Sequence, residues 1–424
     1  MLTLNRLVNG ARRTSQVVSL IGRLAGGLVA VVVLAGIVPM IDPAMAGAVG
    51  GHSITVTNLP TTPAFDGNPC SRPKSADPTC PTYNSCLKLL SCTGDAPDPA
   101  IVHSGATYFA FSTGTALGNS IQVLESSTLT GSYHAWPQIT CFQPSTGTTP
   151  CAARYGSSAF GTSGATGLPA WTTPGAQTSP APIFLHGRWL LYYDAVNVAT
   201  GRFCLAVAKI SPTAQGADGA MLEPTFVTPR GASQPLACDP PDDYEQNVGL
   251  IDPSPFVDPS SGDAYLLYKS NDGSSKAPAF IFSQKLSSNG LSFIEPPHML
   301  LTNDTVNHPW EKTVENPSMV KVNGAYELLF SGGLWYRKGY AQAMAVCSSA
   351  TGPCRQPSGP FLTSYGTLAG PAGGDFFTET DGSLFLVFAA WDNSCIGYPG
   401  PLGTKPAGCT TGSRRLFVAP VSIR

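Results

Sequence analysis

Five segments of the chain repeat one pattern: a short apolar run, a turn that contains glycine, and a second run rich in aromatic and aliphatic residues. Outside an apolar stretch near the N-terminus, the hydrophobic positions show no long helical period. Each segment therefore predicts a β-hairpin, because glycine supplies a turn residue with positive φ and aromatic residues favour a half-buried pleated surface. The predicted hairpins are 98–113, 179–195, 252–270, 315–333 and 374–392.

The spacing of these hairpins predicts an all-β fold, a five-bladed β-propeller from about residue 94 to residue 424. Their turn glycines recur at intervals that suit a four-stranded sheet with loops of variable length. Further strands are expected after three hairpins, at 203–211, 280–287 and 341–349. Small sheets that cannot bury both faces alone bury them by stacking radially. The segment Ser53–Val56 is expected to close the ring or to add an outer strand.

The first 46 residues predict a secretory signal peptide. Four arginines precede or flank an apolar stretch at 24–40, and Ala44-Met45-Ala46 fits a small-residue cleavage site. The alternative is an uncleaved membrane anchor, because the apolar run approaches the ~18 residues of a membrane span. We therefore expect a protein that is secreted or held in the cell envelope, with membrane contact only through such an anchor.

Twelve cysteines follow this segment, and an even number in an exported chain predicts disulfides. Four of them lie in a Cys- and Pro-rich stretch at 47–93, which we interpret as a disulfide-stapled N-terminal extension. Three close pairs are expected to staple loops: Cys141/Cys151, Cys347/Cys354 and Cys395/Cys409. No pair has C-x-x-C spacing, which argues against thiol redox chemistry and a zinc knuckle.

Charged residues make up only 12% of the chain and the net charge is −2, without a long basic run. A nucleic acid partner is therefore not expected, since its binding needs a concentrated basic face. The chain also lacks G-x-S-x-G, P-loop and G-x-G-x-x-G motifs, which argues against serine esterases and nucleotide-binding enzymes.

Among so few charges, three acids stand out because each opens a predicted hairpin: Asp98, Asp252 and Glu315. A propeller brings equivalent positions of its blades together at one mouth of the central channel. Carboxyls crowded in a cleft repel one another and lose solvation, so at least one should keep its proton near neutral pH. A protonated and an ionised carboxyl are what glycoside hydrolysis requires. The alternative for each acid taken singly is a structural role, since Asp before Pro is common in loops.

Three aromatic residues, Trp310, Trp335 and Tyr336, lie beside the fourth hairpin and near Glu315. Aromatic rings that flank carboxylates commonly stack on sugar faces, so these three are candidate substrate-binding residues. The alternative is packing within the propeller. Trp335 is the strongest candidate, because the glycines around it make its loop a poor core position.

The hairpin sequences resemble glycoside hydrolase family 43, whose members are five-bladed furanosidases and xylosidases. The resemblance rests on "DPAIV", "SPAPIFLHGRWLLYYDA", "IDPSPFVDPSSGDAYLLYKS", "VENPSMVKVNGAYELLFSGG" and "CSSATGPC", and is strongest from Ile251 to Cys354. It implies that Asp98 is the general base, that Asp252 adjusts the pKa and orientation of the acid, and that Glu315 is the general acid of an inverting reaction. It further implies a monomeric enzyme that needs no cofactor and cleaves arabinofuranosyl linkages of arabinan-type polysaccharides, with xylosyl linkages as the second option.

The chain also departs from the family pattern. The second blade has "TSPAP" in place of Trp-Ala-Pro, and the fifth has "GPAGGDFF" where members often carry Gly-His. Relatives use a channel histidine to hold a central ion or water, so a calcium ion in the central channel stays an open question and no metal ligand is assigned. These departures keep two alternatives open: a non-catalytic glycan-binding propeller of the cell envelope and a stapled scaffold for a partner protein.

Overall fold

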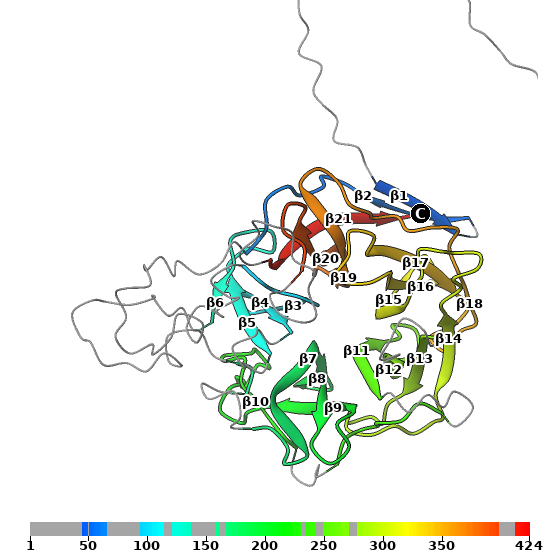
Figure 1. Cartoon of the computed structure of the whole chain (residues 1–424). Coiled ribbons are helices and arrows are strands. Elements are labelled where there is room, and N and C mark those ends of the chain that lie inside the picture. Colours follow the sequence, from blue (N-terminus) through cyan, green and yellow to red (C-terminus); the bar gives the residue numbers. More distant parts are fainter. Residues whose placement is uncertain are drawn as a thin grey trace, which may run out of the picture. The chain divides into compact units, whose positions relative to one another are not determined.

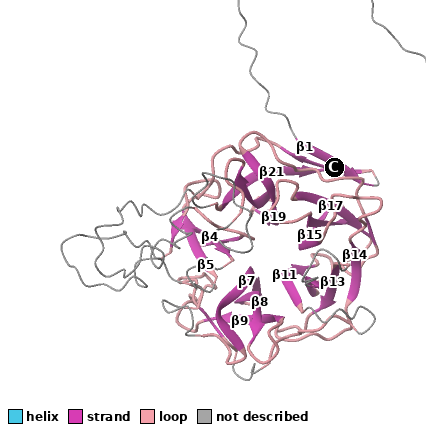
Figure 2. Cartoon of the chain, in the orientation of Figure 1, coloured by secondary structure: helices cyan, strands magenta, loops and turns pink. Residues whose placement is uncertain are grey.

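The computed structural model describes residues 45–49, 51–65, 94–113, 121–136, 158–160, 167–229, 234–241, 249–270, 278–397 and 412–424. The predicted signal peptide up to residue 44, the four cysteines of the predicted extension, and Cys141, Cys151 and Cys409 lie outside these residues. The described residues form strands and loops only, without a helix (Figure 2). In particular, no described helix is long and apolar enough to cross a membrane.

The described strands form five antiparallel sheets arranged around a central axis, which confirms the five-bladed β-propeller (Figure 1). The first strand of each sheet (β3, β7, β11, β15 and β19) lies nearest the axis. Blade 1 comprises β3 (Ala100–Ser104), β4 (Thr107–Ser112), β5 (Gln122–Ser126) and β6 (His134–Ala135). Blade 2 comprises β7 (Thr172–Leu185), β8 (Arg188–Asn197), β9 (Phe203–Ile210) and β10 (Phe226–Val227). Blade 3 comprises β11 (Leu250–Val257), β12 (Ala264–Ser270), β13 (Phe280–Lys285) and β14 (His298–Thr302). Blade 4 comprises β15 (Val314–Val322), β16 (Ala325–Gly332), β17 (Ala341–Cys347) and β18 (Cys354–Arg355).

Blade 5 joins strands from both ends of the described chain. It comprises β19 (Leu368–Thr378), β20 (Leu384–Asp392) and β21 (Arg414–Ile423), followed outward by β2 (His52–Val56) and β1 (Met45–Val49). The sequence expectation for Ser53–Val56 is confirmed, since β2 pairs with β21 as an outer strand. The first residues of the region that we assigned to an N-terminal extension are thus part of the propeller, and the predicted cleavage point after Ala46 falls within β1.

Each gap between neighbouring blades is filled by one apolar cluster. Side chains alternate between the two faces of a strand, so Leu328 of β16 packs toward blade 3 while Leu329 packs toward blade 5. Leu266 and Leu267 of β12 divide in the same way between blades 2 and 4. Strands buried on both faces explain why the hairpin sequences are rich in aliphatic and aromatic residues at consecutive positions.

The described disulfides confirm one predicted pair and add another. Cys347 and Cys354 are bonded across β17 and β18, as their spacing predicted. Cys204 is bonded to Cys238, a pair that the sequence did not identify. Cys395 is disulfide-bonded as well.

The place of β2 in blade 5 leads to a stability prediction. Ile54 is 1% exposed and packs in the cluster between blades 4 and 5, so Ile54→Ala should lower the free energy of unfolding by about 2–4 kcal/mol. Urea unfolding followed by tryptophan fluorescence measures this change. The matched control is Thr55→Ala on the opposite face of β2, which should change the stability by less than about 0.5 kcal/mol. An equal, small effect of both substitutions would show that β2 is not part of the folded blade.

Candidate active site

A β-bulge interrupts the first strand of four blades at the same place, close to one end of the channel. The pairing with the second strand skips two residues there: Ser179-Pro180, Asp252-Pro253, Asn316-Pro317 and Gly373-Gly374. The first residue of each bulge has a positive φ, between 48° and 63°. Asn, Asp and Gly tolerate this left-handed conformation best, and proline is tolerated in a bulge because no ladder N–H is required of it.

Blade 1 has the same arrangement at the entry to its first strand. Asp98 has a φ of 50° and precedes Pro99, directly before β3. The pairs Asp98-Pro99 and Asp252-Pro253 are therefore not hairpin turns. They are bulge positions that turn a side chain toward the centre of the ring, and we refer to Asp98, Ser179, Asp252, Asn316 and Gly373 as the bulge residues.

This alignment corrects one detail of the sequence analysis, which treated Glu315 as equivalent to Asp98 and Asp252. Asn316 is the bulge residue of blade 4, and Glu315 lies one position earlier, opposite Ser331 of β16. Despite this offset, Glu315 still lies close to Asp252. Its side chain is 11% exposed, and its charge acts on the carboxyl of Asp252.

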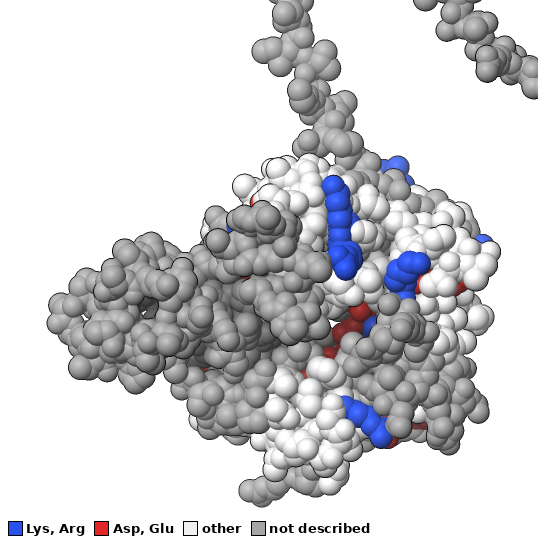
Figure 3. Space-filling model, viewed as in Figure 1, with Lys and Arg blue, Asp and Glu red and all other residues white. Residues whose placement is uncertain are grey.

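The bulge residues line a cavity at the centre of the ring. Its lining includes Asp98, Ser179, Asp252, Asn316, Gly373 and Asp375. In the space-filling view, acidic atoms lie at the floor of a central hollow with basic atoms beside them (Figure 3). The structure thus brings two of the predicted acids into one cavity and places the third beside it.

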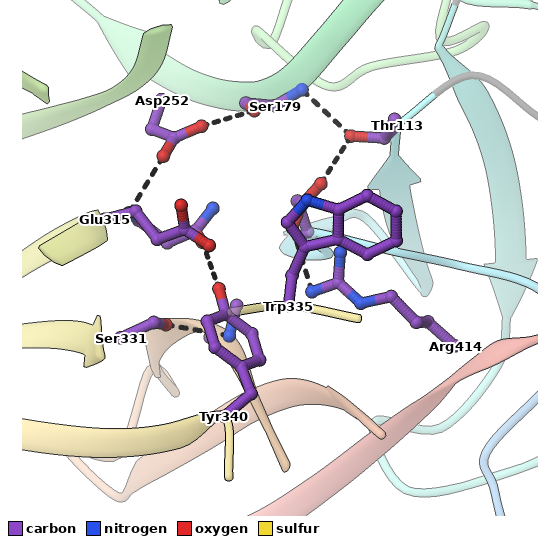
Figure 4. Close-up of polar contacts among 12 residues, drawn as sticks. Thr113, Ser179, Asp252, Glu315, Ser331, Trp335, Tyr340 and Arg414 are labelled. Atoms are coloured by element: carbon purple, nitrogen blue, oxygen red, sulfur yellow. Dashed lines mark hydrogen bonds and ion pairs between the residues drawn. The ribbon is translucent and has the colours of Figure 1, made fainter. Parts of the chain in front are cut away.

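A chain of hydrogen bonds links the bulge residues around the cavity (Figure 4). The Ser179 hydroxyl donates to Asp252 Oδ1 over 2.7 Å, and the Asn316 backbone N–H donates to Asp252 Oδ2 over 3.0 Å. The Tyr340 hydroxyl in turn donates to Asn316 Oδ1 over 2.8 Å. Both carboxyl oxygens of Asp252 are thereby fixed by groups from blades 2 and 4.

Asp98 is held from the other side by blades 1 and 5. Thr113 donates its hydroxyl hydrogen to Asp98 Oδ2 over 2.8 Å, and Arg414 Nη2 lies 3.0 Å from Asp98 Oδ1. Gly373 makes room for this ion pair, because a Cβ at that position would collide with Arg414 Nη2 and lie 3.0 Å from Asp98 Oδ1. A buried guanidinium next to a carboxylate stabilises its ionised form.

The second strand of each blade carries a matching position, opposite the residue that precedes the bulge. In three blades an oxygen there accepts the backbone N–H of the next blade's bulge residue. Thr113 Oγ1 accepts from Ser179 at 3.0 Å, Asp194 Oδ2 from Asp252 at 3.0 Å, and Ser331 Oγ from Gly373 at 2.8 Å. These bonds join blades 1 to 2, 2 to 3, and 4 to 5 at the mouth. Asp194 was missed by the sequence analysis.

In blade 3 the matching position is Lys269, opposite Ile251. It is 1% exposed, and its Nζ lies 3.1 Å from Glu315 Oε2 and 3.0 Å from Thr313 Oγ1. Glu315 is therefore ion-paired with a buried cation that the sequence analysis did not identify.

Burial and repulsion decide where a proton resides among these carboxyls. Loss of solvent and the nearby charge of Glu315 raise the pKa of Asp252 to about 8. Burial also raises the pKa of Asp194 to about 6, against the opposing effect of its hydrogen bonds from Thr178 and Asp252. Burial likewise raises the pKa of Asp375 to about 6. The sequence predicts that at least one acid keeps its proton near neutral pH, and Asp252 has a pKa above neutral in this structure.

The three candidate aromatic residues occupy different environments. Trp335 is half-buried, lies between Thr113 and Arg414 in the close-up (Figure 4), and stacks on Trp391 with the ring centroids 6.3 Å apart. Tyr336 packs edge-on against Trp335 and contacts Arg337. Trp310 instead packs in the cluster between blades 3 and 4, stacked on Phe330 and directly against Gly332.

The described residues do not fit a channel calcium site. The fifth-blade segment that carries histidine in relatives has Gly373, Gly374 and Asp375 here. The Ser318 hydroxyl donates a 2.6 Å hydrogen bond to Asp375 Oδ1. Among the described residues, no three His, Cys, Asp or Glu side chains gather in a way that could hold a metal ion. We therefore assign no catalytic step to a metal.

The raised pKa of Asp252 predicts how stability depends on pH. Its carboxyl loses its proton near pH 3.8 when the chain is unfolded but near pH 8 in the folded protein. Between these values the folded state holds one more proton than the unfolded state. The stabilisation of the folded state by this proton is therefore complete below pH 3.8 and is lost as the pH rises toward 8. Asp252→Asn cannot ionise, so its unfolding free energy should rise relative to the wild type from pH 5 to pH 8 in urea titrations. The control Asp194→Asn should show the same trend only up to about pH 6. Parallel pH profiles of Asp252→Asn and the wild type would contradict the assignment.

Comparison with known proteins agrees with this geometry. Residues 179–424, more than half of the chain, match the model of glycosyl hydrolases family 43. A thermostable family-43 glycoside hydrolase has the same fold with a TM-score of 0.52 and 18% identity, over 78% of this chain and 88% of its own. The α-L-arabinanase of Cellvibrio cellulosa, complexed with arabinohexaose, gives a TM-score of 0.52 and 17% identity, over 77% of this chain and 91% of its own. An α-L-arabinofuranosidase from Lactobacillus brevis gives a TM-score of 0.50 and 16% identity, over 77% of this chain and 90% of its own. No curated protein matches the chain. The chain belongs to glycosyl hydrolases family 43.

Proposed function

We propose that the protein is an exported, inverting glycoside hydrolase that cleaves arabinofuranosyl linkages in arabinan-type polysaccharides. One observation carries this proposal: carboxyls from blades 1, 3 and 4 meet at one mouth of the propeller. Asp98 and Asp252 line the same cavity, and the charges of Glu315 and Asp98 both act on Asp252 and on Tyr340.

In this proposal Asp98 is the general base and Glu315 the general acid. Asp98 removes a proton from the water that attacks the anomeric carbon, while Glu315 gives a proton to the glycosidic oxygen as the bond from the anomeric carbon to that oxygen breaks. The ion pair with Arg414 supports the role of Asp98, because a base must be ionised before it reacts. Inversion requires room for a water between the two carboxyls, a gap of ~6.5–9.5 Å.

Asp252 adjusts the acid. It holds a proton near neutral pH, and its ionisation would place a second negative charge next to Glu315. By repulsion, each carboxyl of such a pair favours the protonated form of the other. The hydrogen bonds from Ser179 and Asn316 hold Asp252 in the orientation in which this coupling acts.

Two observations support arabinofuranosides as substrates. Two proteins with the same fold are an arabinanase bound to arabinohexaose and an arabinofuranosidase, which makes arabinofuranosides the first substrates to test, with β-xylosides second. In the close-up, the half-buried ring of Trp335 lies between Thr113 and Arg414, the two partners of Asp98, and offers a surface on which a sugar face can stack.

Export is supported by the N-terminal sequence and by the disulfides. The apolar stretch with its small-residue cleavage site is typical of a secretory signal. The bonds Cys204–Cys238 and Cys347–Cys354 suit an oxidising compartment.

Substitution of the acid and the base tests the catalytic roles. Glu315→Gln and Asp98→Asn should each lower kcat on arabino-oligosaccharides by about 10²–10⁴-fold, since each removes one proton transfer. Proton NMR of the first product should show the inverted anomer, and circular dichroism should show that both variants remain folded. Full activity in either variant would remove that residue from the mechanism. Calorimetric binding of oligosaccharides without any cleavage by the wild type would instead favour a glycan-binding propeller.

Trp335→Ala tests the substrate-binding role. Loss of the stacking surface should raise KM about tenfold, which corresponds to about 1.4 kcal/mol of binding, with kcat within about threefold of the wild type. Trp310→Phe serves as the control, because Trp310 packs between blades and its replacement should leave KM unchanged. An unchanged KM in Trp335→Ala would show that the ring does not contact the sugar.

A further inference from the structure

Lys269 differs in chemistry from the residues at the matching position of blades 1, 2 and 4. At the matching position, Thr113, Asp194 and Ser331 each place an oxygen on the backbone N–H of the next bulge residue. An ammonium group has no lone pair and cannot accept that bond. In blade 3 the acceptor is instead the bulge residue itself: Asp252 Oδ2 accepts the backbone N–H of Asn316, the bulge residue of blade 4.

This exchange leaves the ammonium of Lys269 available for a carboxyl. A buried ammonium is costly unless it is paired and hydrogen-bonded. Nζ meets this requirement through Glu315 Oε2 and Thr313 Oγ1, both in blade 4. The cation thus links β12, the strand paired with the one that carries Asp252, to the segment that carries Glu315.

The contact engages only one oxygen of the proposed acid. Oε2 is bound by Lys269, whereas Oε1 accepts no hydrogen bond from the residues that the structure describes. The Glu315 side chain is 11% exposed, compared with 2% for Lys269. The carboxyl is therefore fixed on its inner side and keeps one oxygen for a leaving group.

We propose that Lys269 is a positioning residue of the reaction: it fixes Glu315 through Oε2, directs Oε1 to the glycosidic oxygen, and by its charge sets the pH range in which the Asp252–Glu315 pair keeps its proton. This inference rests on the proposed function. It adds a residue to the proton-donating side of the site that the three acids alone do not include.

Several charged groups face the same carboxyl and define what Lys269 contributes. Asp252 of β11 and the Tyr340 hydroxyl both interact with the charge of Glu315. Across the cavity lie Asp98 with Arg414 of β21, and behind Asp252 lies Asp194 of β8. Lys269 is the cation on the Glu315 side, as Arg414 is on the Asp98 side. Its removal should therefore favour protonation of the Asp252–Glu315 pair.

The leaving group of the substrate separates positioning from a general loss of structure. In Lys269→Met, kcat on an arabino-oligosaccharide should fall about 10- to 100-fold, part of the factor that general acid catalysis supplies. With a dinitrophenyl arabinofuranoside, whose leaving group needs no proton, kcat should stay within about threefold of the wild type. Equal losses on both substrates would overturn the proposal.

The pH profile tests the effect of the charge. The basic limb of kcat/KM reports loss of the acid's proton, so it should move to higher pH in Lys269→Met. Lys269→Gln keeps a donor without the charge, and should shift the limb with a smaller loss of kcat. Lys269→Arg keeps the charge and should leave the limb in place. A limb that does not move in Lys269→Met and Lys269→Gln would refute the charge effect.

Lys321→Met is the matched control. Lys321 also pairs with a carboxylate between blades 3 and 4, Asp258 at 3.2 Å, but beside the hairpin turns rather than at the mouth. Its loss should leave the leaving-group dependence and the pH profile unchanged. A shift like that of Lys269→Met would mean that any blade-bridging lysine produces the effect, and would refute the specific role.

Titration of the carboxyls distinguishes a failure of this inference from a failure of the proposed function. A wild type that cleaves none of the glycosides would refute the function. Carbon-13 NMR of labelled Asp and Glu carboxyls, assigned with Asp252→Asn and Glu315→Gln, needs no turnover. The Asp252 and Glu315 signals should titrate at higher pH in Lys269→Met than in the wild type. Superimposable titration curves would overturn the assignment of Lys269 whatever the activity.

Discussion

The mouth of this propeller depends on one backbone constraint, a left-handed bulge residue at the inner strand of each blade. A bulge takes its N–H out of the strand ladder, and a buried N–H needs an acceptor. In three of the five steps around the ring, that acceptor is a side chain from the second strand of the preceding blade. The hydrogen bonds that satisfy the bulge N–H groups therefore also join neighbouring blades. The same contacts fix the geometry of the site and help to close the ring.

The constraint also restricts which residues can stand at the mouth. A positive φ favours Asp, Asn and Gly, and these account for four of the five bulge residues, with Ser179 as the fifth. Short polar side chains are thus placed around the axis for backbone reasons, and two of them are carboxylates. Gly373 has a separate reason, since only the absence of a Cβ lets Arg414 reach Asp98.

Charge is balanced on the two sides of the cavity by one buried cation each. Arg414 lies against Asp98, and Lys269 lies against Glu315. Asp252, and Asp194 behind it, have no cation bonded directly to either carboxyl among the described contacts, and burial raises the pKa of both, as it does for Asp375 in the cavity lining. The two buried cations thus lie against the proposed base and the proposed acid, and Asp252, which adjusts the acid, is the neighbouring carboxyl whose pKa is raised to about 8.

Much of this architecture was predictable from the sequence, because a repeated hairpin pattern follows directly from burial on both faces of short strands. The five hairpins, the third strands and the approach of Asp98, Asp252 and Glu315 to one another follow from that pattern. The offset of Glu315 could have been found by aligning the hairpins on Pro99, Pro180, Pro253 and Pro317 instead of on their acids. Lys269 and Asp194 carried a weaker signal, a charge at the fourth position of the aligned stretches "LLYK" and "LYYD", whose meaning depends on strand register. Arg414 could not be found in this way, since no repeat relates it to Asp98.

The account stands on a sugar ring that is bound between carboxyls of separate blades. A crystal structure of Glu315→Gln soaked with arabino-oligosaccharide tests it most directly. The account predicts an anomeric carbon over the bulge residues, with a water between it and Asp98, the glycosidic oxygen beside residue 315, and the ring of Trp335 against a sugar. An oligosaccharide bound away from the central cavity, or an anomeric carbon out of reach of both residues 98 and 315, would contradict it.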